Sequence, residues 1–149
     1  GMPISAMIAY SDIMDWVPGS HASTFGGNPV ACAASLATLD LVEKSLMNNA
    51  RVVGDYLLSE LRKMQRRYEV IGDVRGKGLM IGVELVKDRE TKAMAIKERD
   101  FLVKKAFEKG LLLLGCGSNS IRFAPPLIIT KKDADTALTI MDDVLKLIS

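Results

Sequence analysis

The sequence predicts an α+β fold for the part of the chain that begins near Tyr68. Short apolar runs of strand length alternate there with segments whose apolar residues recur at helical spacing. Stretches that contain glycine or proline separate these segments and supply the turns. The resulting order, β-β-α-β-β-α, is that of a small layered domain. The preceding part offers one strand and one long helix, which cannot enclose a core alone. We therefore expect a complete small domain that follows the end of a larger one.

The bulk composition excludes several classes of function. The chain of 149 residues is long enough for one ordinary domain, and its 20 basic and 18 acidic residues nearly balance. That balance favours neither a nucleic-acid nor a membrane partner. Two cysteines and one histidine, in no metal-ligand spacing, predict no metal site and a reduced, cytoplasmic protein. No apolar run reaches the roughly 18 residues of a membrane span.

The first third of the chain predicts a strand, a loop and a helix. Residues 3–10, PISAMIAY, form an apolar run typical of a buried strand. Residues 11–27 are rich in Gly, Ser and Asp and have no periodicity, which indicates a long loop. Asn28-Pro29 is a good helix start, because Asn caps the first turn and Pro loses no hydrogen bond there. The helix should reach about Arg67, with a bend or interruption between Met47 and Gly54.

The rest of the chain predicts four strands and two helices. The expected strands are residues 70–74, 79–86, 111–114 and 120–127. Residues 91–110 read as an amphipathic helix that Gly110 ends, since glycine adopts the left-handed conformation of a helix C-terminus. Thr130 and Asp133 have the spacing of a capping box, which starts the last helix.

The stretch HASTFGGNP, residues 21–29, is a candidate anion site. Its glycines let backbone N–H groups approach a phosphate, the hydroxyls of Ser23 and Thr24 add donors, and a helix N-terminus follows. The alternative is a tight helix entry in which Ser, Gly and Asn serve turn geometry alone. No phosphate-loop lysine follows and the spacing fits no dinucleotide fingerprint, so the residues themselves leave both interpretations open.

Arg122 is a second candidate, for binding a carboxylate. It lies between Ile121 and Phe123, so the alternation of a strand points its side chain away from these apolar neighbours. Pro125-Pro126 then ends the strand. A guanidinium held in this way suits bidentate capture of a carboxylate, whereas the alternative is an arginine that merely faces water.

Two other features do not predict a site. The glycines of VRGKGLMIG, residues 74–82, have the wrong spacing for a nucleotide loop, and a strand follows them instead of a helix. They are better explained as glycines of a hairpin, and Lys77 as part of its turn. His21 is the only imidazole and has no apparent Ser, Cys or Asp partner, so we do not assign it as a base.

Four stretches together carry a family resemblance. GMPISAMIA, HASTFGGNPVACAA, VRGKGLMIGVEL and IRFAPPLIIT span residues 1–130. In this order and at these distances they resemble the C-terminal portion of class III (ω-amino-acid) pyridoxal-phosphate-dependent aminotransferases. The wording is closest to the 4-aminobutyrate and acetylornithine aminotransferases of that family.

The resemblance implies a fold and a set of site residues. The fold is the small C-terminal α+β domain of a fold-type I enzyme, an antiparallel sheet with helices on one face, here residues 55–149. Residues 1–54 would be the end of the large cofactor domain with the interdomain helix. Thr24, assisted by Ser23, matches the donor to the cofactor phosphate across the subunit interface of a homodimer or higher homo-oligomer. Arg122 matches the arginine that binds the carboxylate of the amino acid or 2-oxo acid substrate.

The resemblance also implies what the chain lacks. The family's Schiff-base lysine lies just before the segment that matches Gly1, and the aspartate that pairs with the pyridine nitrogen lies further upstream. No residue of this chain is therefore assigned as catalytic. We expect the chain alone neither to retain pyridoxal phosphate nor to transaminate. The Gly1-Met2 start fits a piece of a longer enzyme or a reading frame that begins at Met2.

Two other functions stay open at this stage. The chain could be a folded non-catalytic fragment that acts as a dimerisation or complementation module. It could also be an independent anion-binding α+β protein, which would bind phosphate at Gly26-Gly27 without any preference for pyridoxal.

Overall fold

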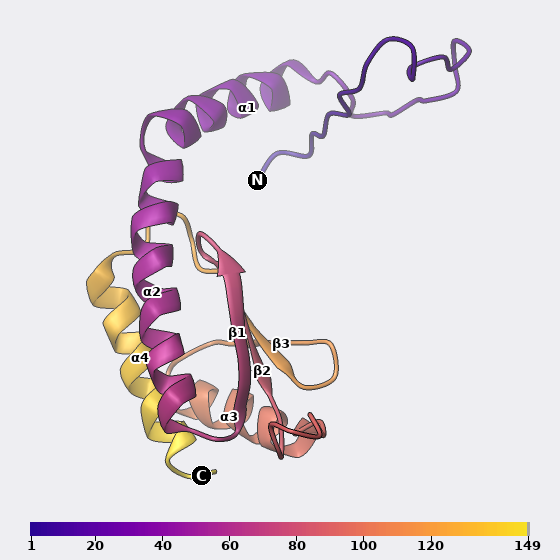
Figure 1. Cartoon of the computed structure of the whole chain (residues 1–149). Coiled ribbons are helices and arrows are strands. Elements are labelled where there is room, and N and C mark those ends of the chain that lie inside the picture. Colours follow the sequence, from indigo (N-terminus) through magenta and orange to yellow (C-terminus); the bar gives the residue numbers. More distant parts are fainter. Residues whose placement is uncertain (149) are drawn as a thin grey trace. The chain divides into compact units, whose positions relative to one another are not determined.

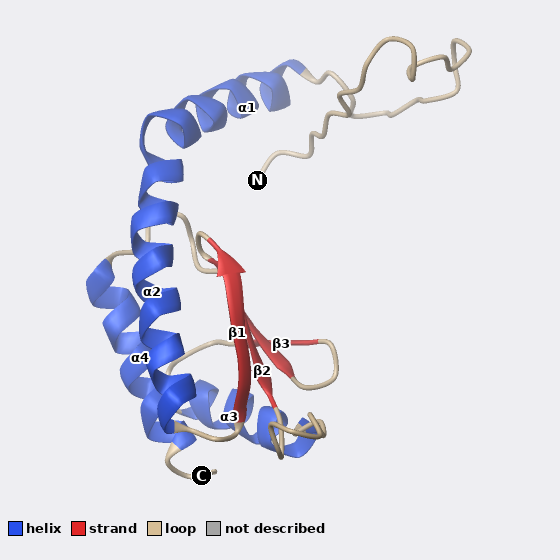
Figure 2. Ribbon diagram, in the orientation of Figure 1, coloured by secondary structure: helices blue, strands red, loops and turns tan. Residues whose placement is uncertain are grey.

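The computed structural model describes residues 1–148 and divides into two compact units, Gly1–Ser45 and Leu46–Ser149. The first unit contains an irregular segment and helix α1, Pro29–Leu41. The second contains helices α2, α3 and α4 and a sheet of four strands (Figures 1 and 2). The sequence-based boundary between residues 54 and 55 stays a prediction about the parent fold.

The irregular segment of the first unit corrects one sequence prediction. Residues 3–10 form no strand and are exposed, so the predicted strand is wrong. A strand needs a neighbour whose N–H and C=O groups pair with its own, and none of the described residues pairs with this segment. Helix α1 begins where expected: the side chain of Asn28 accepts hydrogen bonds from the N–H groups of Val30 and Ala31 at 3.0 and 3.1 Å.

The predicted long helix is present, but its irregularity lies earlier than expected. Five residues of π-helix, Val42–Leu46, join α1 to α2, Met47–Arg67. A π-helix adds one residue to a turn and is a recognised cause of local irregularity in helices. Gly54 does not interrupt the helix; it lies inside α2, where the turn between two strands packs directly on it. An ideal Cβ at Gly54 would lie 2.2 Å from the carbonyl carbon of Gly78.

The sheet is antiparallel throughout, as expected from the resemblance. Its strands are β1 (Ile71–Lys77), β2 (Met80–Leu85), β3 (Leu114–Cys116) and β4 (Ser120–Phe123), in the order β1-β2-β4-β3. The predicted strand 111–114 is misplaced, since β3 shares only Leu114 with it, and β4 is shorter than the predicted 120–127. Pro125 and Pro126 have no N–H to donate, so pairing of β4 stops before them.

Helices α2 and α3 cover one face of the sheet, and α4 packs against these two helices (Figure 2). Helix α2 packs on β1, while α3 (Ile96–Glu108) packs on β2, β3 and β4. Helix α4, Lys131–Leu145, packs on the other two helices and begins with the predicted capping box of Thr130 and Asp133. The core contains the sheet side chains that face these helices, among them Ile71, Val74, Ile81, Val83, Leu85, Ile121 and Phe123. The opposite face of the sheet is therefore the one left for other contacts.

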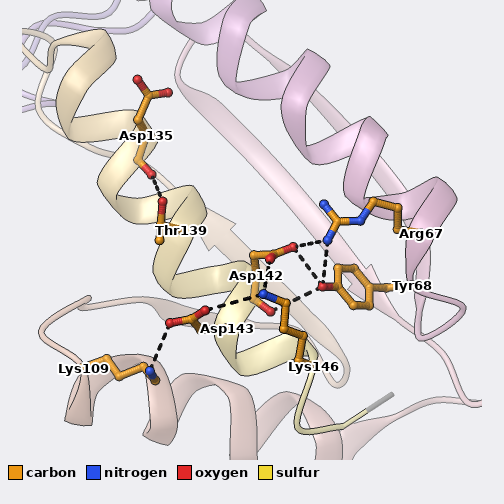
Figure 3. A network of polar contacts seen from close by, with 8 residues as sticks. All are labelled: Arg67, Tyr68, Lys109, Asp135, Thr139, Asp142, Asp143 and Lys146. Atoms are coloured by element: carbon orange, nitrogen blue, oxygen red, sulfur yellow. Dashed lines mark hydrogen bonds and ion pairs between the residues drawn. The ribbon is translucent and has the colours of Figure 1, made fainter.

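A polar network ties the C-terminal end of α2 to α4 (Figure 3). The carboxylate of Asp142 accepts from Arg67 at 2.7 Å, from the hydroxyl of Tyr68 at 2.8 Å and from Lys146 at 2.8 Å. Partial burial of Asp142 raises the pKa of its carboxyl. The hydrogen bonds from Lys146 and Tyr68 and the charge of Arg67 outweigh that effect, so its net pKa lies below the ordinary value of 3.8.

Asp142→Asn should lower the free energy of unfolding at pH 7 by about 1–2 kcal/mol, because charge-assisted hydrogen bonds are lost from a mostly buried group. A depressed carboxyl pKa stabilises the fold above the unfolded pKa, and this stabilisation disappears as the pH falls through the folded pKa. The difference between wild type and variant should thus shrink as the pH drops below about 4. Urea unfolding at pH 7 and pH 2.5 measures it. A difference that is equal at both values would contradict the assignment.

Candidate functional site

The candidate site lies on the face of the sheet that the helices leave open. The strand register aligns one residue from each strand across this face: Arg75, Gly82, Arg122 and Leu114. Their neighbours along the strands, Ile121 and Phe123 among them, point into the core. The alternation that predicts an outward-facing Arg122 is therefore present in the structure.

Arg122 is an exposed cation without a partner. Within residues 1–148 no hydrogen bond or ion pair joins its guanidinium to another residue. It borders a hollow of about 380 Å³, whose lining also includes Arg75, Gly82, Cys116 and Ser120. The guanidinium is therefore free to meet an anion that enters this hollow.

Arg75, on the same face, is by contrast paired with two carboxylates. Its guanidinium contacts the carboxylates of Asp73 at 2.6 Å and Glu84 at 3.0 Å. Hydrogen bonds to Asp73 and Glu84 raise the pKa of Arg75 above its ordinary value. Sequence reasoning missed this group. Alternation along β1 does place Asp73 and Arg75 on one face, but only the hairpin register adds Glu84.

The second candidate is the turn that precedes α1, in the first unit. The hydroxyl of Ser23 accepts a hydrogen bond from the N–H of Gly26 at 3.1 Å. Asn28 caps two further N–H groups, so the helix start offers fewer free donors than the sequence suggested. The side chain of Thr24 is exposed, and Gly27 adopts a φ of +72° with open space around it. The hydroxyls of Thr24 and Ser23 are the side-chain donors that this turn leaves available.

The remaining polar candidates form no centre of their own. His21 is exposed and its ring lies near that of Trp16, while Cys32 and Cys116 are free thiols. Within the described residues, His, Cys, Asp and Glu side chains do not gather in a group that could hold a metal ion. Nor does any helix between residues 1 and 148 have the length and apolarity needed to cross a membrane.

Comparison with known proteins identifies the family. Residues 1–145 match the family described as aminotransferase class-III. The chain is 49% identical over 93% of its length to a leucine/methionine racemase of Thermococcus litoralis, and 42% identical over 97% to an acetylornithine aminotransferase of Caldanaerobacter subterraneus. It covers 32% and 35% of those two proteins.

Solved structures agree with this match. An amine transaminase from an uncultivated Pseudomonas species, solved with pyridoxal phosphate bound, superposes on 87% of this chain with a TM-score of 0.80 and 36% identity. The chain covers 30% of that structure, so it spans about a third of the length of the proteins it matches. Sequence and fold lead to one conclusion: the chain belongs to the class III aminotransferase family.

Proposed function

We propose that this chain is the C-terminal part of a pyridoxal-phosphate-dependent aminotransferase. The parent enzyme would move an amino group from an ω- or α-amino acid, such as 4-aminobutyrate, to a 2-oxo acid in the cytoplasm. The observation that carries the proposal is the unpaired guanidinium of Arg122 on the open face of the sheet. Family membership supports transamination as the reaction, and of the two relatives named above one is an aminotransferase and the other a racemase.

Arg122 would bind the substrate carboxylate. Two parallel N–H···O bonds from one guanidinium fix both the position and the plane of a carboxylate, which a lysine cannot do. The strand holds the base of the side chain, and the core contacts of Ile121 and Phe123 hold the strand. Arg122 thereby orients the substrate without taking part in bond breaking.

Thr24 and Ser23 would bind the cofactor phosphate, and the turn fits that task in part. The hydroxyl of Thr24 is exposed, and Ser23 retains its own proton to donate while its oxygen accepts from Gly26. Both residues offer hydrogen bonds that suit phosphate oxygens. When bound, pyridoxal phosphate supplies the electron sink for the reaction. The covalent attachment and the rest of the phosphate site would come from the part of the enzyme that precedes Gly1 and from a second subunit of a homodimer.

A second candidate function is a non-catalytic folded module that complements a separate polypeptide. The observation that favours it is the number of large apolar side chains that the first unit exposes: Ile8, Tyr10, Ile13, Trp16, Val17, Phe25, Leu36 and Leu39. Exposed apolar surface of this extent indicates a contact with another protein surface.

The chain alone should show no transamination when supplied with pyridoxal phosphate, an amino donor and a 2-oxo acid. The reason is that the family's Schiff-base lysine matches a position before Gly1. A chimera tests the positive side of the proposal. In it, this chain replaces the matching C-terminal third of the Caldanaerobacter subterraneus acetylornithine aminotransferase. Product formation by the chimera, measured by chromatography, is the expected result.

Product formation also separates the two candidate functions, the covalent enzyme and the complementation module. Activity on mixing the chain with the truncated relative would favour the complementation module, whereas activity of the chimera alone favours the covalent enzyme. Transamination by the isolated chain would contradict both.

A further inference from the structure

The feature that leads further is an acidic side chain close to Arg122. Glu84 lies two residues along β2 from Gly82, which is the direct cross-strand neighbour of Arg122. Glu84 and Arg122 are therefore diagonal neighbours on the open face. Such pairs have Cα atoms about 7–8 Å apart, within reach of long side chains.

Only small residues lie beside this diagonal: Gly82 on β2 and Ser120, the cross-strand partner of Glu84, on β4. Gly82 has no side chain, and a Cβ built there would meet only the carbonyl oxygen of Arg75, at 3.9 Å. Its backbone does not need glycine either, because its φ is not positive. A glycine within a strand often marks a site that a ligand or another part of the protein approaches closely. Glu84 could therefore pair with Arg122 across this gap.

The structure shows instead that Arg75 holds Glu84. The guanidinium of Arg75 contacts Glu84 at 3.0 Å and Asp73 at 2.6 Å. Asp73 and Glu84 are direct partners across β1 and β2. Without Arg75 the two carboxylates would repel each other, since like charges directly opposite one another in a sheet are unfavourable. Repulsion from Asp73 would push Glu84 toward Arg122.

We propose that Arg75 is a positioning residue that keeps Arg122 free by sequestering Glu84. The carboxylate of Glu84 and the carboxylate of the substrate compete for Arg122. Arg75 binds Glu84 and so takes it out of this competition. This proposal rests on the proposed function in one respect: the freed guanidinium is taken to bind the substrate carboxylate. The sequestration itself is a property of this chain and is measurable without any reaction.

The experiment is a rate measurement on the full 149-residue chain. Phenylglyoxal modifies free guanidinium groups, and mass spectrometry of the digested protein gives the rate at each arginine. Arg122 should react fast in the wild type. In Arg75→Gln we expect its rate to fall about threefold, the size of change that a modest surface ion pair produces. In Arg75→Gln/Glu84→Gln the rate should return to the wild-type value.

Matched variants make the outcome specific. Lys77→Gln removes a positive charge from the same face of β1, but Lys77 forms no ion pair within the described residues, so the Arg122 rate should not change. Arg75→Lys keeps the charge and should retain most of the wild-type rate. Glu84→Gln alone should leave the rate unchanged, because Glu84 is already held by Arg75. Arg99, whose side chain is 15% exposed, reports in the same digest that each variant is folded.

Each result either supports or overturns the proposal. An unchanged Arg122 rate in Arg75→Gln, or a slow rate that Glu84→Gln does not rescue, would overturn it. A faster rate in Glu84→Gln alone would also overturn it, since Glu84 would then already pair with Arg122. None of these outcomes depends on whether Arg122 binds substrate, so failure here and failure of the proposed function are distinguishable.

Discussion

Arg122→Ala should raise KM for carboxylate substrates strongly in the chimera described above. The substituted enzyme would lose a charge-assisted, bidentate pair, the kind of interaction whose removal costs about 2–5 kcal/mol. At about 1.4 kcal/mol per factor of ten, kcat/KM should fall by roughly 30-fold to several thousand-fold. Steady-state kinetics with a 2-oxo acid measure the effect.

Two controls sharpen this test. Arg122→Lys keeps the charge but not the planar fork, so it should recover only part of the loss. Amines without a carboxylate should be affected far less than amino acids, because they make no contact with the guanidinium. An unchanged KM for carboxylate substrates would remove Arg122 from the site, whatever the outcome of the modification experiment on Arg75.

Gly54→Ala should destabilise the second unit by about 3 kcal/mol, the upper end of the range for overpacking. The added Cβ would lie 2.2 Å from the carbonyl carbon and oxygen of Gly78, which are backbone atoms and cannot rotate away. In an exposed helix the same substitution would stabilise by about 1 kcal/mol, so the expected sign is opposite to that of helix propensity.

Urea unfolding followed by circular dichroism measures this change. Ser59→Ala, on the exposed side of the same helix, is the matched control and should leave the stability nearly unchanged or slightly raised. A Gly54→Ala variant as stable as the wild type would mean that α2 and the β1–β2 turn do not pack as closely as the structure places them.

Local patterns predicted much of the second unit. The Thr130–Asp133 capping box, the outward-facing Arg122 and the β1–β2 hairpin depend on residues close in sequence, and the structure contains all three. The antiparallel order of the sheet came from the family resemblance. Hydrophobic periodicity alone predicts where strands lie in the sequence, but it does not predict the order of the strands in the sheet.

The failures have a common physical cause. Residues 3–10 have the apolar character of a buried strand, but no described segment supplies its hydrogen-bonding partners. Gly54 suggested a helix break, whereas the structure needs a glycine there because the backbone of Gly78, beyond the following strand, lies against it. The pairing of Arg75 with Glu84 likewise depends on a register that composition does not reveal. Each failure concerns whether two separate segments come into contact, and a local sequence pattern carries little information on that.

The close approach of Gly54 to Gly78 has a consequence for the order of folding. It joins α2 to the β1–β2 hairpin, segments that are adjacent in the chain. The contact of Tyr68 with Asp142 instead closes a loop of 74 residues. Closing a short loop costs less entropy and occurs sooner than closing a long one. We therefore expect α2 and the hairpin to form the nucleus, on which β4 and α4 assemble once the end of the chain is available.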